Sequence, residues 1–121
     1  MAKKESLPSD AQVEKFQMLN ELADSIYIEM KEFSKKKPDD VLNAFKVKTL
    51  NRVLTQLKDF LKDEPTVSFL DLLDEETLPS NSDAILIIGQ FKAAMENFKK
   101  KNTTRYNNWK TIENPLGRRR D

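Results

Sequence analysis

Two long segments with helical periodicity, separated by a proline, constrain this chain most. From Asp10 to Lys37 there is no glycine or proline, and apolar residues recur every three or four positions. That spacing places them on one face of a helix. Pro38 prevents the helix from continuing. A heptad pattern follows in the second segment, at Val47, Leu50, Leu54, Leu57 and Leu61. We predict helices over about 10–36 and 39–62, antiparallel because the turn is very short.

A third helix is predicted to begin near residue 83. Ser82 or Asp83 is expected to cap it, just as Ser9 and Gln12 form a capping-box pattern before the first helix. The segment Ile85–Ile88 is apolar on nearly every side, which predicts burial all round in the groove of the hairpin. The expected core comprises Phe16, Leu19, Ile26, Leu50, Leu54, Leu57, Ile88, Phe91 and Met95.

The connection between the second and third helices is acidic. Residues 63–83 carry seven acidic side chains and no basic one. Thr66 or Ser68 is expected to cap a short helix that runs through Leu73. We therefore predict an all-α fold, a helical bundle built from a long antiparallel helical hairpin plus a third long helix and a short connector helix. Residues 9–113 form its single domain, between a flexible N-terminus at 1–8 and a frayed, basic C-terminal tail at 114–121.

Composition argues against most catalytic chemistries. The 121 residues include no cysteine and no histidine, which are the usual thiol nucleophile and general base, and only two glycines. Two carboxylate pairs at magnesium-binding spacing, Glu21 with Asp24 and Glu29 with Glu32, lie on one helix, so we expect them to face solvent. We predict no enzyme activity, no cofactor and no metal.

The chain is also expected to be an intracellular, cytoplasmic protein. No secretory signal is visible, and the longest apolar run, Ala84–Ile88, is far shorter than the roughly 20 residues that span a bilayer. We therefore predict no membrane partner. In its Lys/Glu/Asn-rich helices and its lack of Cys and His, the chain resembles small bacterial or phage accessory proteins in composition, although no motif carries this likeness.

The acidic connector holds the first candidate site. Its apolar and acidic residues are Phe69, Leu70, Leu72, Leu73, Asp74 and Glu75. One interpretation is a short helix that packs Phe69, Leu70 and Leu73 on the bundle and leaves its carboxylates in water. A second is a docking element whose apolar face enters the groove of a partner. A third is a divalent-metal site made by Asp71, Asp74 and Glu75.

The basic C-terminal stretch holds the second candidate site. Residues 84–121 have a net charge of +6. The residues that would contact phosphates or bases are Lys99, Lys100, Lys101, Arg105, Tyr106 and Trp109. Alternatives are a solvated helix end with Trp109 packed on the bundle, and pairing of this stretch with the acidic connector of the same or a neighbouring copy. Tyr106, Trp109 and Ile112 keep helical spacing, so the third helix could extend or restart there.

These patterns predict a binding protein. The first hypothesis is a non-enzymatic interaction module, a structural subunit or adaptor that binds a protein partner or itself, with a homo-oligomer expected. Its basis is that such long amphipathic helices have more apolar surface than three helices cover. The alternative is a nucleic-acid-binding accessory protein that uses the basic C-terminal stretch.

Overall fold

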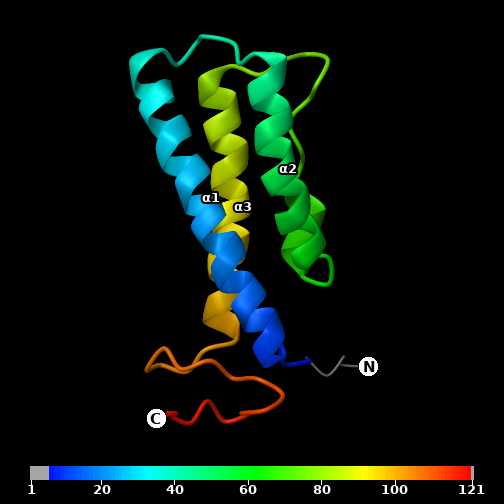
Figure 1. Ribbon diagram of the computed structural model, residues 1–121, viewed down its shortest axis with the longest axis vertical. Coiled ribbons are helices and arrows are strands. Elements are labelled where there is room, and N and C mark those ends of the chain that lie inside the picture. Colours follow the sequence, from blue (N-terminus) through cyan, green and yellow to red (C-terminus); the bar gives the residue numbers. More distant parts are fainter. Residues whose placement is uncertain (1–5, 121) are drawn as a thin grey trace.

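The computed structural model describes residues 6–120 of the chain. In that range the chain forms three α-helices and one 3-10 helix: α1 (Asp10–Lys36), α2 (Ala44–Phe60), η1 (Pro65–Phe69) and α3 (Asn81–Lys101). The three α-helices stand side by side, with α1 antiparallel to both α2 and α3 (Figure 1). The all-α bundle with a long antiparallel hairpin and a third helix is therefore confirmed.

The predicted capping box starts α1. The backbone N–H of Gln12 donates to Ser9 Oγ at 3.1 Å, and the N–H of Ser9 donates to Gln12 Oε1 at 2.8 Å. Such a cap contributes about 1 kcal/mol to helix stability. Lys35 and Lys36 occupy the last turn, where cations are favoured by the helix dipole.

The prediction that the second helix begins near residue 39 and runs to 62 is wrong at both ends, because α2 spans Ala44–Phe60. Asn43 caps it by accepting the N–H of Lys46 at 2.8 Å. The residues before this cap bond instead to the segment that precedes α3. The N–H of Leu42 donates to the carbonyl of Pro79 at 2.9 Å. The connection between α1 and α2 is therefore longer than a tight turn.

The predicted connector helix is also shorter than expected. Instead of continuing through Leu73, the 3-10 helix η1 ends at Phe69, and residues 70–79 form no helix. They run back beside α2 to the other end of the bundle (Figure 1). The buried side chain of Asn51 on α2 holds them there, since it bonds both the N–H and the carbonyl of Leu73 at 2.9 Å. This return makes α2 and α3 parallel.

The cap of α3 lies earlier than predicted. Ser80 Oγ, rather than Ser82 or Asp83, accepts the N–H of Asp83 at 3.1 Å. The prediction that Ile85–Ile88 is buried all round is wrong, because Leu86 is 64% exposed while Ile88 is fully buried. One side of α3 packs on α1 and α2, and the opposite side faces solvent. Of the predicted core residues, Ile26 is only partly buried and the others are buried.

The C-terminal residues 102–120 fold under the bundle at the end that holds the start of α1 and the end of α3 (Figure 1). We call this end the base. Residues 102–113 do not extend α3. Thr103 and Trp109 instead pair across a tight loop in which Asn107 has a φ of 64°.

The predicted terminal segments make contacts at the base. Residues 1–5 of the N-terminus predicted to be flexible, and residue 121 of the tail, lie outside the described range. Pro8 is buried, and its carbonyl accepts the N–H of Ile112 at 2.9 Å. In the tail, Gly117 is buried against the loop and Arg120 pairs with Asp10 at 3.1 Å. These contacts differ from the fraying expected of the tail.

Candidate protein-docking surface

The exposed side shared by α1 and α2 carries an apolar groove. We call it the α1–α2 face, and its residues are Leu22, Ile26, Glu29, Phe33, Phe45, Lys46, Thr49 and Val53. Leu22 is 44% exposed, Phe33 39% and Phe45 77%. The hollow that Leu22 and Val53 line extends across the outer side of α2 to Leu72 and Glu75 of the connector, and its volume is about 830 Å³. An exposed aromatic and aliphatic surface of this kind is typical of a protein-binding site.

The helical register explains why this face stays open. The apolar stripe of α1 is wider than one row of side chains. Leu19, Ala23 and Met30 are buried, whereas Leu22 and Phe33 lie beside that row, toward α2. Because α1 packs mainly along α3, this flank has little to cover it. The ammonium of Lys46 lies 4.6 Å from the centre of the Phe33 ring and covers it only in part.

At the base, aromatic side chains are packed together instead. The rings of Phe16 and Trp109 have centroids 5.1 Å apart, and those of Phe60 and Phe98 are 5.0 Å apart. Phe16 also stacks on Phe98 at 5.6 Å. Trp109 comes from the C-terminal segment, so that segment closes the lower end of the bundle.

The predicted docking residues of the acidic connector are divided between core and surface. Leu70 and Leu73 are buried, whereas Leu72 is 39% exposed beside α2 and Phe69 is 76% exposed at the end of η1. The connector is therefore not a single apolar ridge, since its alternate leucines bind it to its own bundle.

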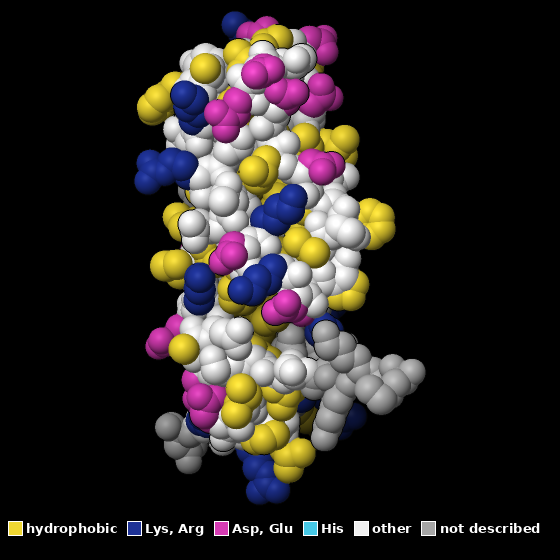
Figure 2. Space-filling model, turned by 90° about the vertical axis from the view of Figure 1, so that its right-hand side faces the viewer, with side chains coloured by type: hydrophobic (Ala, Val, Ile, Leu, Met, Phe, Trp, Pro, Cys, Tyr) yellow, Lys and Arg dark blue, Asp and Glu magenta, His cyan; other side chains and the backbone are white. Residues whose placement is uncertain are grey.

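The acidic residues of the connector have local roles. Asp74 Oδ1 accepts the N–H groups of Glu76 at 2.8 Å and Thr77 at 3.0 Å. These backbone donors, Thr77 first, hold the pKa of Asp74 below its usual value. Glu75 lies 3.4 Å from the amide of Asn51. On the side of the molecule that α2 faces, Asp and Glu gather toward the upper end, whereas Lys and Arg lie mostly over the middle and lower parts (Figure 2).

The predicted nucleic-acid-binding residues are likewise separated. Lys101 Nζ pairs with Glu64 at 2.8 Å, and Trp109 belongs to the aromatic cluster. Lys100 and Arg105 are exposed, Lys99 is partly exposed, and Tyr106 is 70% exposed. The guanidinium of Arg105 lies 4.9 Å from the centre of the Tyr106 ring. A smaller surface of Lys99, Lys100, Arg105 and Tyr106 therefore remains.

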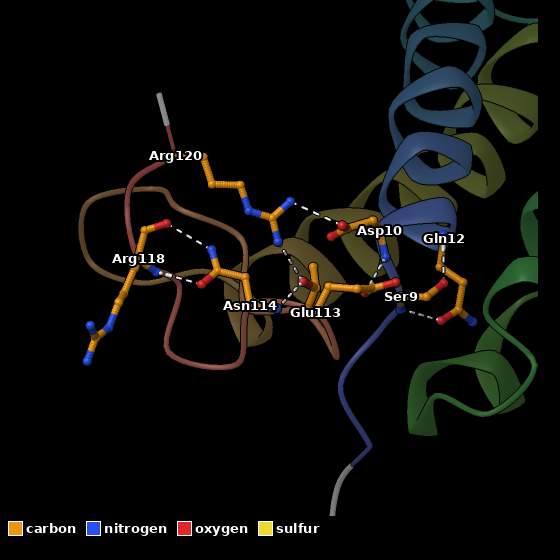
Figure 3. Close-up of polar contacts among 8 residues, drawn as sticks. Ser9, Asp10, Gln12, Glu113, Asn114, Arg118 and Arg120 are labelled. Carbon is orange, nitrogen blue, oxygen red and sulfur yellow. Dashed lines mark hydrogen bonds and ion pairs between the residues drawn. The ribbon is translucent and has the colours of Figure 1, made fainter.

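A polar cluster joins the start of α1 to the C-terminal segment (Figure 3). The N–H of Asp10 donates to Glu113 Oε1 at 3.0 Å, and its carboxylate accepts from Arg120 at 3.1 Å. The hydrogen bond from Arg120, followed by one from Thr111, lowers the pKa of Asp10. Asn114 fixes the segment further by bonding both backbone groups of Arg118, at 2.8 and 3.2 Å. The cluster holds the segment that covers the base.

The carboxylates of α1 do not converge on a common point. Asp24 pairs with Lys92 of α3 at 2.6 Å, and Glu32 lies 3.9 Å from Lys35. Among residues 6–120, no three His, Cys, Asp or Glu side chains are grouped so as to hold a metal ion. Within the same range, no helix has the length and apolar character needed to cross a bilayer.

No protein-family model, curated protein or solved structure matches this chain. Neither predicted site included Leu22, Phe33 or Phe45. The available signal was the width of the apolar stripe on α1, which exceeds a single seam, together with Phe45 two residues before the heptad begins.

Proposed function

We propose that the protein is a non-enzymatic interaction module, a structural subunit or adaptor, that binds a helix of another protein chain in the α1–α2 face. One observation carries this proposal: Leu22, Phe33 and Phe45 are exposed in two hollows that meet at Thr49 on the α1–α2 face. Burial of apolar surface is the dominant favourable term in most protein–protein association. The groove between two helices provides the site where a further helix of a bundle packs.

Composition supports the same proposal. Without cysteine or histidine the chain has no thiol nucleophile and no imidazole base. Charged side chains flank the groove and apolar ones line it, which is the arrangement of an interface with an apolar core and a polar rim. The lack of cysteine also supports our proposal that the module acts in the reducing cytoplasm.

A photo-crosslinking residue tests which surface meets a partner. We expect p-benzoylphenylalanine at Phe45, in cells that naturally make the protein, to give a covalent adduct with a protein. The same residue at Leu86, which is exposed on α3, provides the matched control and should give none. If position 45 gives no adduct, or if both positions give the same adducts, the proposed docking face is wrong.

A second candidate function is nucleic-acid binding at the base. The favouring observation is the loop that presents Arg105 and Tyr106. Thr104 Oγ1 accepts the N–H groups of Tyr106 and Asn108 at 3.2 Å, so this loop holds its exposed aromatic tip in place. Exposed aromatic rings beside cations stack on the bases of single strands.

Its test is a titration of single-stranded DNA and RNA at two salt concentrations. This candidate predicts binding that weakens steeply with salt and is lost when Lys99, Lys100 and Arg105 are changed to Glu. Lys101 is left unchanged because it pairs with Glu64. Absence of any complex at low salt would eliminate this function.

A further inference from the structure

We infer that the occupant of the α1–α2 face is the same face of a second copy of this chain. The two copies are related by a two-fold axis parallel to the helices, so that α1 of each copy lies over α2 of the other. This inference rests on the proposed function and names its partner.

The two helices carry complementary charge. α1 has six acidic and four basic side chains, a net of −2, whereas α2 has one acidic and four basic, a net of +3. A two-fold interface brings the same patch of both copies together, so that patch must complement itself. Because α1 is acidic and α2 is basic, the two patches attract each other only when α1 of each copy faces α2 of the other.

Residues of α1 and α2 on this face also lie in pairs at the same level along the bundle axis. Glu29, Phe33, Phe45 and Lys46 line one hollow of a single copy, and Leu22 and Val53 line the next. An axis parallel to the helices keeps every residue at its own height. It therefore brings Glu29 to the partner subunit's Lys46, Phe33 to the partner's Phe45 and Leu22 to the partner's Val53. Each contact occurs twice in the dimer.

An axis perpendicular to the helices is the main competing arrangement. It would place the acidic α1 on the acidic α1 of the partner, and the basic α2 on the basic α2. It would also bring the acidic upper end over the basic base, which is favourable. Those end charges lie on solvent-exposed side chains and are screened within about 8–10 Å at physiological salt. Charges at the edge of an apolar interface are screened less, so they decide the arrangement.

Two charge reversals test this arrangement. Glu29→Lys alone places two ammonium groups together at each of the two equivalent contacts, and Lys46→Glu alone places two carboxylates together there. We expect each variant to dimerise at least about tenfold more weakly than the wild type in sedimentation equilibrium. An equimolar mixture of the two variants should recover a one-to-one dimer, because each of its two contacts then joins an ammonium group to a carboxylate.

The pairing in the mixture follows from the parallel axis. In the mixed dimer, one contact joins the two reversed side chains, Glu29→Lys of one copy and Lys46→Glu of the other, and the second contact joins the unchanged Glu29 and Lys46. Both contacts are therefore attractive, whereas each variant alone has two repulsive contacts. This difference is what makes the mixture recover the dimer.

The controls are Glu96→Lys and Lys100→Glu, which reverse exposed charges on α3, and neither should alter the dimer. A wild-type dimer that both reversals weaken, but that does not re-form when the variants are mixed, overturns the parallel axis. A wild type that stays monomeric while position 45 crosslinks to another protein overturns self-association and leaves the proposed function intact. Absence of any adduct overturns both.

Discussion

The base and the upper half of the α1–α2 face use similar side chains in opposite ways. At the base, Phe16 and Phe60 are covered by Phe98 and Trp109. In the upper half, Phe33 and Phe45 remain exposed. The C-terminal residues 102–120 fold under the base (Figure 1). At the upper end, residues 40–43 of the α1–α2 connection lie beside Phe33 but leave it 39% exposed.

The apolar stripe of α1 is covered to different extents at its two ends. The stripe on α1 continues from Phe16 to Phe33, but the chain supplies its own cover for only one end. Our proposal assigns the burial of the upper face to another chain.

The largest expected effect is on the free energy of unfolding, when an aromatic ring is removed from the base or from the upper face. We expect Phe16→Ala to lower the free energy of unfolding by about 4 kcal/mol, because it removes a buried ring and leaves a cavity. Phe45→Ala, its matched control, should change that free energy by less than about 0.5 kcal/mol in the monomer. Urea unfolding at a concentration where the chain is monomeric measures both. Equal losses would show that the upper face is not open.

Periodicity predicted the helices well and their ends poorly. Phe16, Leu54 and Ile88 were placed in the core because a 3.6-residue repeat fixes which side chains share a face. The start of α2 was misplaced because Asn43, rather than an acidic residue after Pro38, caps the helix by accepting the N–H of Lys46 in its first turn. Long-range backbone bonds, such as that of Leu42 with Pro79, leave no local signal in the sequence.

The candidate site was predicted less well than the fold. Helical spacing shows that Leu22 and Phe33 lie beside the buried row of α1, but not which neighbouring helix covers them. That depends on α1 packing mainly along α3, an arrangement that helical spacing does not specify. The connector itself was expected to be helical, so its alternate burial of Leu70 and Leu73 was also missed.

The next largest change in the free energy of unfolding is expected on the side of α2 that the connector covers, compared with its exposed side. Asn51→Leu should lower the free energy of unfolding by about 3 kcal/mol, because it leaves the buried N–H and carbonyl of Leu73 without partners. Thr55→Ala, at an exposed position of the same helix, is the control and should have little effect. If Asn51→Leu is harmless in urea unfolding, the connector is not held by this side chain.

A smaller change in stability is expected when either of the two glycines is replaced by alanine, and the two changes should have opposite signs. At Gly117, φ is +64° and an added Cβ would lie 2.5 Å from Thr104 Cγ2, so Gly117→Ala should cost about 2 kcal/mol. At Gly89, within α3, the nearest atom would be Tyr27 Cε1 at 3.7 Å, an ordinary contact. Gly89→Ala should therefore stabilise the protein by up to about 1 kcal/mol through helix propensity. Thermal unfolding of both variants measures the difference, and the same sign for both would contradict it.

The smallest effect concerns how the base is held closed. Arg120 and Thr111 lower the pKa of Asp10 from its ordinary value near 3.8, so the folded protein holds this proton less tightly than the unfolded chain. The stability from this contact is therefore present above about pH 4 and is lost as the pH falls through the lowered pKa. Arg120→Gln should reduce stability at pH 7, and its difference from the wild type should shrink in acid. Arg119→Gln, at an exposed neighbouring position, is the control. Urea titrations from pH 7 to pH 2 measure both, and a difference that does not change with pH would show that Arg120 acts on the base without its ion pair to Asp10.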